Sequence, residues 1–324
     1  MCTAVTLKTK DFYFGRTLDY EHGWGEEVTV LPRKFPLSFR HLACPENHYA
    51  IIGMARIEKD YPLYFDGCNE RGLAMAGLNF VGNAVYGKCV QGKDNIAQFE
   101  LIPWILSQCA CVQEAKTLLR HLNLTDTAFS PDLPPAQLHW LLADRDQALT
   151  VEAVGEGLRI YENPVGVLTN NPPFDHQLFR LRDFLHLSSY APENRFSGKL
   201  DLKPYSRGMG ALGLPGDVSS QSRFIRAAFV KENSLSGTGE AESVSQFFHI
   251  LGSVEQVNGC CRVEEGQCEK TIYTSCCNTD RGIYYYTTYE NRGITAVQLH
   301  RENLDSSRLI RFSLLREEQI RSQN

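Results

Sequence analysis

The sequence predicts an α+β protein in which strands occupy both ends of the chain and helices are grouped in the middle. Short runs that alternate apolar and polar side chains, or are rich in β-branched and aromatic residues, recur before residue 81 and after residue 269. Apolar residues at helical spacing recur between residues 98 and 251. Because no internal repeat, low-complexity segment or linker divides the chain, we expect residues 1–324 to form one domain.

The composition is that of a globular protein and excludes several classes of function. Of the 324 residues, 43% are hydrophobic and 22% are charged, and the formal net charge of −5 leaves no basic footprint for nucleic acid. No apolar run approaches the ~18 residues of a membrane-spanning helix. Lys8, Lys10 and Asp11 interrupt any signal-like apolar region. We expect a cytoplasmic protein with reduced cysteines and with no nucleic-acid or membrane partner.

The first part of the chain predicts a series of strands. The expected strands are 3–8 and 11–17, which form a hairpin, followed by 27–31, 49–54 and 73–80. The polar segment 32–47 is broken by Pro36 and Pro45, so we expect a loop there. The aromatic segment 60–67 contains Pro62 and is also expected to be a loop, either at the edge of the core or in the wall of a ligand pocket.

The remainder predicts helices and then further strands. The expected helices are 98–121, which Pro103 divides or caps, 174–187, 222–229 with Ser219 or Ser220 as N-cap, and 240–251. The expected strands are the hairpin 138–143 and 148–153, the short strand that ends at 169, and 270–275, 282–288 and 294–299. Segments 126–135 and 189–210 are expected to be irregular.

Cys2 is a candidate nucleophile because it follows the initiator Met1. If Met1 is removed, Cys2 carries a free α-amino group beside its own thiol. The reference pKa of an α-amine is about 7.7–8.0 and that of a thiol about 8.5, so the two groups can exchange a proton near neutral pH. A nucleophile that uses its own amine as base is a known way to activate a weak nucleophile. The alternative is that Cys2 is only a small residue at the chain start.

Other residues supply the remaining groups that acyl transfer requires. A hairpin would return Arg16 and Asp19 to the chain start, either as a surface ion pair or as partners of Cys2. Asn79 ends a buried strand, where its amide either ties down a loop or donates to an oxyanion. A second strand stops at two adjacent amides, and Arg223 begins a helix.

Other chemistries have weaker support. The pairs Cys260–Cys261 and Cys276–Cys277 lack the C-x₂₋₄-C spacing of structural zinc sites, so we expect no metal. A serine hydrolase would require a G-x-S-x-G elbow, which the sequence lacks. The glycines of 208–213 match G-x-G-x-x-G without the strand–helix context of nucleotide binding. We therefore expect no cofactor.

A set of short motifs occurs along the chain in a fixed order. The motifs are Met1-Cys2-Thr3-Ala4, Tyr13-Phe14-Gly15-Arg16 with Asp19, Asp60-Tyr61-Pro62-Leu63-Tyr64, Met75 to Phe80, Leu138-His139-Trp140, Gly166 to Pro172, Gly213 to Asp217, Ser222-Arg223-Phe224, and Tyr284-Tyr285-Tyr286. This set resembles the choloylglycine hydrolase family, which contains conjugated bile salt hydrolases and penicillin V acylases and belongs to the N-terminal nucleophile hydrolases. Each motif is weak alone, but together and in this order they are specific. The resemblance covers essentially the whole chain.

The resemblance implies a four-layer αββα sandwich and a catalytic set around Cys2. In this set Cys2 is the nucleophile, Asp19 holds its amine, Arg16 favours the thiolate, and Arg223 fixes the surrounding charges. Asn79 borders the scissile amide, and Asn170 donates to the oxyanion, with Asn171 as the less favoured alternative. The steroid pocket of the family maps to Leu18, Tyr20, Phe65, Phe129, Leu133 and Leu138, together with Asn79.

The implied reaction is hydrolysis of the amide that joins a bile acid to glycine or taurine. Penicillin V acylase is the alternative within the family, although Asn79 favours the bile salt branch because the acylases tend to carry Tyr there. A non-catalytic protein that binds bile acids or other lipids is the alternative of a different class. The resemblance also implies a homotetramer.

Overall fold

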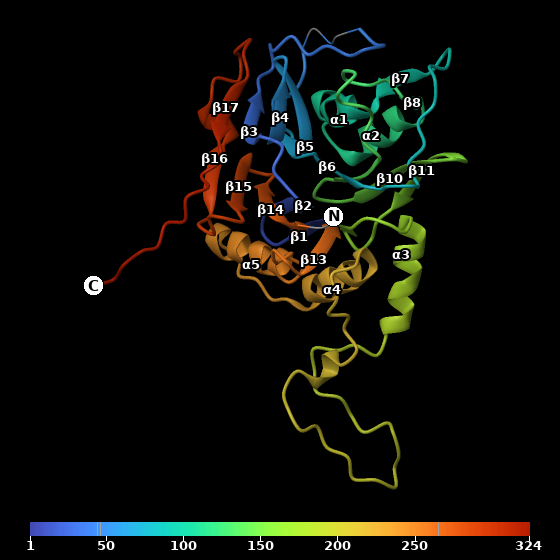
Figure 1. Cartoon of the computed structure of the whole chain (residues 1–324), viewed down its shortest axis with the longest axis vertical. Coiled ribbons are helices and arrows are strands. Elements are labelled where there is room, and N and C mark those ends of the chain that lie inside the picture. Colours follow the sequence, from blue (N-terminus) through green and yellow to red (C-terminus); the bar gives the residue numbers. More distant parts are fainter. Residues whose placement is uncertain (44, 46, 265) are drawn as a thin grey trace.

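Two large antiparallel sheets form the centre of the fold (Figure 1). The computed structural model describes residues 1–43, 45, 47–264 and 266–324. The seven-stranded sheet has the order β12-β1-β2-β14-β15-β16, with β13 paired to β14, and the eight-stranded sheet has the order β11-β10-β9-β6-β5-β4-β3-β17. The short strands β7 and β8 pair in parallel outside these sheets.

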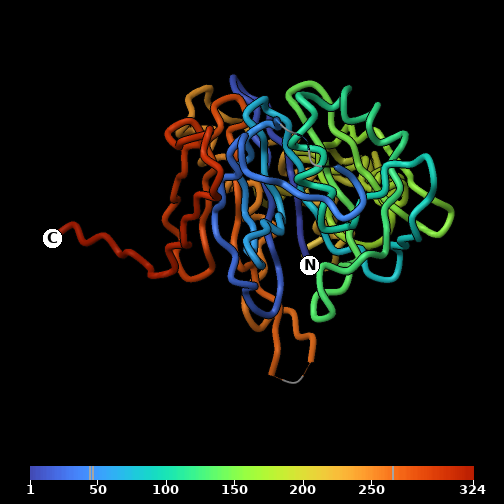
Figure 2. The backbone as a smooth tube through the Cα atoms, turned by 90° about the horizontal axis from the view of Figure 1, so that it is seen from above, coloured from blue at the N-terminus to red at the C-terminus, as the bar shows by residue number. Residues whose placement is uncertain are grey.

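The strands of the seven-stranded sheet are β1 (Cys2–Lys8), β2 (Phe12–Tyr20), β12 (Val167–Leu168), β13 (Cys261–Glu264), β14 (Gln267–Asn278), β15 (Ile283–Thr288) and β16 (Thr295–Gln298). Those of the eight-stranded sheet are β3 (Glu26–Leu31), β4 (Ile51–Glu58), β5 (Tyr61–Asn69), β6 (Ala74–Asn79), β9 (Leu138–Ala143), β10 (Ala148–Val154), β11 (Gly157–Glu162) and β17 (Ile310–Ser313). The separate pair is β7 (Asp94–Ala97) and β8 (Leu122–Thr125). The hairpin of β13 and β14 projects from the body, as do the last residues of the chain (Figure 2).

The helices cover the two outer faces of the sheet pair. They are α1 (Leu101–Gln108), α2 (Val112–Leu119), α3 (Phe174–Arg180), α4 (Ser220–Asn233) and α5 (Glu240–Gly252). One apolar core contains buried side chains of α4, α5, the seven-stranded sheet and the inner face of the eight-stranded sheet. A second core joins the outer face of the eight-stranded sheet to α1 and α2. This arrangement confirms the predicted α+β class and the four-layer αββα sandwich.

Alternation along β6 explains how one strand serves both cores. Ala74, Ala76 and Leu78 belong to the core between the sheets, whereas Met75 belongs to the core beneath α1. Successive strand side chains point to opposite faces, so a nearly continuous apolar run is needed when both faces are covered. Among the described residues, none of the helices has the length and apolarity needed to cross a membrane.

The prediction of a loop over 60–67 is wrong, because these residues form most of β5. Lys59 and Asp60 have positive φ values of 50° and 60° and form a tight turn between β4 and β5. Glu58 therefore pairs with Tyr61, and Pro62 pairs with Ile57 close to the end of the hairpin. The aromatic residues that suggested a loop are favourable in a strand.

Most other predicted elements are confirmed, with shifted ends. The segment 98–121 forms a 3₁₀ turn and two helices, and the helix predicted over 174–187 is α3 followed by a 3₁₀ turn. Ser219 is the N-cap of α4, although its side chain makes no capping hydrogen bond. The strands β7, β8, β11, β13 and β17 were not predicted. Four of them have only four residues each, too short to show a period.

Candidate active site

Cys2 is the first residue of β1 and is buried between the sheets, with 2% of its surface exposed. Its backbone nitrogen donates to Asn170 Oδ1 over 2.8 Å. The amino group of Met1 donates to the backbone oxygen of Asp19 over 2.5 Å and forms an ion pair with Glu269 at 2.9 Å. The amino terminus is thus held by acceptors from β2 and β14.

Arg16 lies directly beside the Cys2 sulfur. Its Nη2 is 2.5 Å from Cys2 Sγ, its Nη1 donates to Gly77 O over 2.5 Å, and its Nε donates to Thr17 O over 3.1 Å. Burial disfavours the charge of this side chain, but the surrounding acidic groups, with Cys2 first among them, raise its pKa above the ordinary value. A guanidinium fixed at this distance stabilises negative charge on sulfur.

A buried carboxylate, Asp66 on β5, lies behind Arg16. It accepts hydrogen bonds of 2.6 Å from Tyr273 and of 2.6 Å from Tyr284. Burial raises the pKa of Asp66, and Arg16 opposes this effect. The sequence reasoning missed Asp66 because it interpreted 60–67 as a loop. If residues 60–67 are taken as a strand, the alternation of side chains between the two faces shows that this carboxylate faces a core.

Asp19 is fully buried on β2 near the amino terminus. Its carboxylate accepts from the hydroxyls of Thr17 over 3.0 Å and Thr271 over 2.7 Å. Its backbone oxygen, rather than its carboxylate, accepts from the amino group of Met1. Asp19 therefore lies beside the chain start, with its side chain held in place by two threonines.

Asn170 connects three parts of the site. Its Oδ1 accepts from Cys2 N and from Arg223 Nη2, the latter over 2.7 Å, and its Nδ2 donates to Asn79 O over 2.8 Å. An amide nitrogen carries two hydrogens. The described residues provide one acceptor, so the second hydrogen is available to a substrate oxygen. Asn171 is exposed and donates instead to Val81 O, so it lies away from the nucleophile.

Asn79 ends β6 and is partly exposed. Within the described part of the chain, its side-chain amide has no hydrogen-bond partner, whereas its backbone oxygen accepts from Asn170. Leu138 is its register partner on β9. An unpaired amide next to Asn170 can donate to a ligand, which fits the oxyanion interpretation better than a role in tying down a loop.

Arg223 links α4 to the first residues of β1. Its Nη1 donates to Cys2 O over 2.5 Å and to Thr3 Oγ1 over 2.6 Å, and its Nε donates to Val218 O over 3.0 Å. The side chain is completely buried. Burial lowers the pKa of Arg223, and the acidic groups Asp19 and Cys2 oppose this effect.

Three of the predicted substrate-binding residues lie next to the cluster around Cys2, which consists of Cys2, Arg16, Asp19, Asn79, Asn170 and Arg223. Leu18 is the register partner of Cys2 in the hairpin of β1 and β2. Phe65 is partly exposed, and its backbone oxygen accepts from Arg16 Nη1 over 3.4 Å. Leu138 lies beside Asn79. Tyr20 ends β2 two residues after Leu18. Tyr20 and Phe65 pack against the core that contains Cys2, whereas Leu138 packs against the core beneath α1.

Phe129 and Leu133 lie in an irregular segment, as predicted, and contact a different set of side chains. The Phe129 ring packs edge-on against Phe99 at 5.1 Å, and the Arg40 guanidinium lies 5.3 Å from its centroid. Phe129 N donates to Leu133 O over 3.1 Å, which closes the loop on itself. These two residues have no hydrogen bond to the cluster around Cys2 among the described residues, and their role in a pocket stays a prediction.

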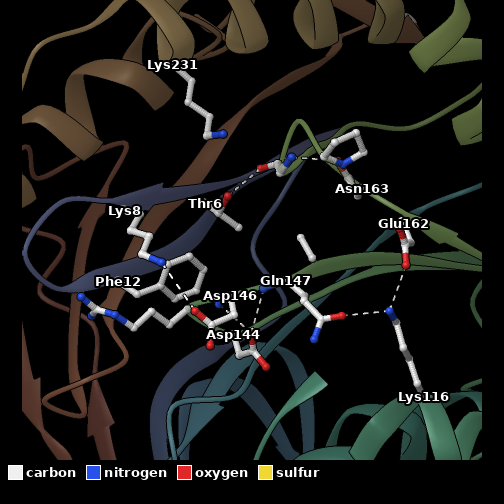
Figure 3. Close-up of a pocket in the computed structure, with 14 residues that line it drawn as sticks. Thr6, Lys8, Phe12, Lys116, Asp144, Asp146, Gln147, Glu162, Asn163 and Lys231 are labelled. Carbon is white, nitrogen blue, oxygen red and sulfur yellow. Dashed lines mark hydrogen bonds and ion pairs between the residues drawn. The ribbon is translucent and has the colours of Figure 1, made fainter. Parts of the chain in front are cut away.

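A pocket of about 410 Å³ lies at the opposite end of β1 from Cys2 (Figure 3). Lys8 and Thr6 contribute to its wall, and Lys116 donates to Gln147 Oε1 over 2.9 Å and to Glu162 Oε1 over 3.1 Å. Lys8 forms an ion pair with Asp146 across the pocket, as Lys116 does with Glu162. The lining contains no thiol, so the pocket lies apart from the candidate nucleophile. In the described ranges, no three His, Cys, Asp or Glu side chains are grouped to hold a metal ion.

The comparison with known proteins agrees with this arrangement. Residues 2–312 match the sequence profile of the linear amide C–N hydrolases, choloylglycine hydrolase family. The chain belongs to this family. A relative in Lactiplantibacillus plantarum, named bile salt hydrolase/transferase, is 55% identical, and the alignment covers 100% of both chains. A relative of the same name in Clostridium perfringens is 37% identical over 95% of both chains.

Solved structures share the fold of this chain. The C2A mutant of the conjugated bile acid hydrolase from Clostridium perfringens superposes with a TM-score of 0.92 at 34% identity, over 100% of both chains. Penicillin V acylase from Agrobacterium tumefaciens shares the fold, with a TM-score of 0.75 at 18% identity over 96% of this chain and 91% of that one. The present chain is therefore a linear amide hydrolase with an N-terminal nucleophile fold.

Proposed function

We propose that this enzyme hydrolyses the amide bond of glycine- or taurine-conjugated bile salts and releases the free bile acid and the amino acid. The observation that carries the proposal is the position of Arg16, whose Nη2 lies 2.5 Å from the sulfur of Cys2 at the start of β1. The full-length likeness to proteins named bile salt hydrolase/transferase supports the substrate class.

Removal of Met1 is the activating event in this proposal, because it frees the α-amino group of Cys2. The thiolate, stabilised by Arg16, attacks the amide carbon. The new carbon–sulfur bond forms as the carbonyl π electrons move to oxygen, which Asn79 and Asn170 stabilise as an oxyanion. The oxyanion collapses, the carbon–nitrogen bond breaks, and the α-amino group passes its proton to the leaving amine.

The second half of the reaction consumes the thioester. The α-amino group of Cys2, now neutral, accepts a proton from water as the water oxygen attacks the thioester carbon. The same two amides stabilise the second oxyanion, and its collapse breaks the carbon–sulfur bond. The bile acid leaves as the carboxylic acid and releases its proton to solvent, and the thiolate is regenerated beside Arg16.

Apolar side chains around the nucleophile suit a rigid steroid body. Leu18, Tyr20, Phe65 and Leu138 form the near wall in this proposal, and Phe129 with Leu133 form a more distant part. Penicillin V is the competing substrate. It has less support, because the acylase that shares the fold is only 18% identical, and Asn79 is an amide where the acylases tend to carry Tyr.

The proposal extends to assembly and location. We infer one domain over residues 1–324, a cytoplasmic location, and a homotetramer. Residues 185–212 extend from the body between α3 and α4 (Figure 1) and expose large apolar side chains, namely Leu185, Tyr190, Phe196 and Tyr205, each at least 81% exposed. We infer that these side chains contribute to contacts between subunits. Light scattering should give the mass of four chains, and a monomer would contradict the assembly.

A side-by-side hydrolysis assay tests the function. We expect cleavage of glycocholate or taurocholate to be much faster than cleavage of penicillin V, with Cys2 as the first residue in the intact mass of the same sample. The reverse ranking of substrates would overturn the assignment. An enzyme that retains Met1 and cleaves neither class would support the alternative of a non-catalytic binding protein.

A further inference from the structure

We propose that His139 is a positioning residue that holds Asn79 and Asn170, the two amides proposed to stabilise the oxyanion. This inference rests on the proposed acyl transfer at Cys2 and adds a residue that has no role in the mechanism above. His139 lies in the middle of the sandwich on β9 and is 0% exposed. It is therefore neither a general base nor a substrate ligand.

The imidazole of His139 contacts the chain neighbour of each amide. Its Nε2 lies 2.8 Å from the backbone oxygen of Thr169, the residue before Asn170. Its ring stacks on Phe80, the residue after Asn79, with ring centroids 4.3 Å apart and an interplanar angle of 7°. One side chain thus joins two segments that are far apart in the sequence.

The orientation of the His139 ring is locked by Glu152. A carbonyl oxygen can only accept, so Nε2 carries a hydrogen and donates it to Thr169 O. The other nitrogen, Nδ1, lies 2.9 Å from Glu152 Oε1, so one further proton lies between these two atoms. Glu152 is also fully buried, and its Oε1 accepts from Phe174 N over 3.0 Å. Both ring nitrogens are therefore engaged, which prevents the ring from rotating.

Further hydrogen bonds hold the same turn. Ser220 Oγ donates to Thr169 Oγ1 over 3.0 Å and accepts from Asn170 N over 2.8 Å. Gln177 Nε2 donates to Asn170 O over 2.5 Å, and Gln177 Oε1 accepts from Thr169 Oγ1 over 2.9 Å. His139 supplies the bond to the Thr169 carbonyl, which these other side chains leave unengaged. Without that bond, the peptide before Asn170 can tilt.

Two reactions of Cys2 distinguish this role from a merely structural one. Amide hydrolysis passes through a tetrahedral oxyanion, so it depends on the position of Asn79 and Asn170. Alkylation of Cys2 by iodoacetamide is a direct displacement at carbon and forms no oxyanion, so it reports only on the thiolate and its access. A residue that positions the oxyanion donors should affect the first reaction and spare the second.

The test compares two substitutions of His139 that each keep one donor. His139→Gln can place an N–H near the position of Nε2 and keep the bond to Thr169 O, whereas His139→Asn reaches only the position of Nδ1 and loses that bond. We expect His139→Asn to lower kcat about 10- to 100-fold, up to the cost of removing one oxyanion donor. KM should change less than about threefold, and the alkylation rate of Cys2 less than about twofold, because neither depends on the oxyanion.

His139→Gln should recover most of the loss, to within about tenfold of the wild-type kcat. The matched control is His176→Gln, since His176 lies on α3 with its side chain 69% exposed and should show wild-type kinetics. A His139→Asn enzyme with kcat within about twofold of wild type would overturn the inference. A parallel loss of alkylation would also overturn it, because the defect would then lie in Cys2 or in the fold.

If His139→Asn does not fold, as judged by thermal unfolding, Glu152→Gln provides the test. That change preserves the shape but removes the carboxylate that shares a proton with Nδ1. It should lower kcat at least about fivefold and spare alkylation, and a wild-type kcat would refute the inference. Failure of the proposed function is separate: if wild type cleaves no conjugated bile salt, the same ratios are measured on penicillin V or an activated ester.

Discussion

Replacing Arg223 by Lys is the sharpest perturbation of the site, because it keeps the charge and removes the geometry. The guanidinium donates through three nitrogens to four acceptors: Val218 O, Cys2 O, Thr3 Oγ1 and Asn170 Oδ1. The single ammonium of Lys is a point donor on a flexible stem and cannot reach acceptors on both sides of the fork. At least two of the four bonds are therefore lost.

The magnitude follows from these lost bonds. A hydrogen bond to a charged group contributes about 1.5–3 kcal/mol, so the loss of two such bonds destabilises the folded enzyme by about 3–6 kcal/mol. Unfolding entropy of about 2.1 cal/mol/K per residue gives ~0.7 kcal/mol/K for a chain of 324 residues. The Tm of Arg223→Lys should therefore be about 4–9 °C lower than that of wild type.

Activity should fall further than stability explains. The Arg223 fork holds Asn170 against the backbone of Cys2, so its loss displaces an oxyanion donor, and kcat should fall roughly 100-fold at temperatures where the variant remains folded. Arg226→Lys is the matched control on the same helix. Arg226 donates to the backbone oxygens of Ser253, Pro215 and Asp217, and among the described residues it has no hydrogen bond to Cys2 or Asn170. The Arg226→Lys variant should have a lower Tm and an unchanged kcat. Equal losses of kcat in the two variants, or a wild-type kcat in Arg223→Lys, would contradict this prediction.

Two further predictions concern the candidate nucleophile Cys2 and Asp217, which lies shortly before α4. Cys2→Ser should fold and lose nearly all turnover of taurocholate. Turnover at the wild-type rate would contradict the proposed mechanism. Hydrogen bonds from Ser219 and Ser222 lower the pKa of Asp217 from 3.8 to about 2, so its stabilising contribution is present above the ordinary pKa and is lost as pH falls toward 2. Urea unfolding between pH 5 and pH 3 should therefore show a smaller loss of stability in Asp217→Asn than in wild type. Asp201→Asn, whose side chain is 80% exposed, is the control and should follow wild type.

Local patterns predicted the parts of this fold that have a strong period. The hairpin of β1 and β2 brings Arg16 to Cys2, and the strand pattern of 73–80 places Asn79 at the end of β6, as expected. The prediction of a loop over residues 60–67 was wrong for a physical reason. Lys59 and Asp60 both have positive φ angles, but neither is the Gly or Asn that usually indicates a two-residue turn.

The supporting groups of the site were harder to predict because they are polar residues inside a core. The sequence alone does not distinguish three of these groups, Asp66, Glu152 and Glu269, from ordinary carboxylates of strands or loops. Their partners are remote in sequence: Glu269 pairs with Met1, and Asp66 with Tyr273 and Tyr284. Only the packing of two sheets brings such residues together. Buried polar groups must be paired, but a single sequence does not name the pairs.

The balance of charge around Cys2 explains why two arginines are buried there. Arg16 and Arg223 are each at most 1% exposed, and an uncompensated buried charge is costly. Burial disfavours the charge of both arginines, but Asp66 and Asp19 favour the charged form of Arg16, and Asp19 also favours that of Arg223. The Cys2 sulfur lies 2.5 Å from Arg16 Nη2, so a guanidinium is in place to stabilise negative charge that forms on sulfur in the proposed acyl transfer. The fold therefore positions this compensation before any substrate binds.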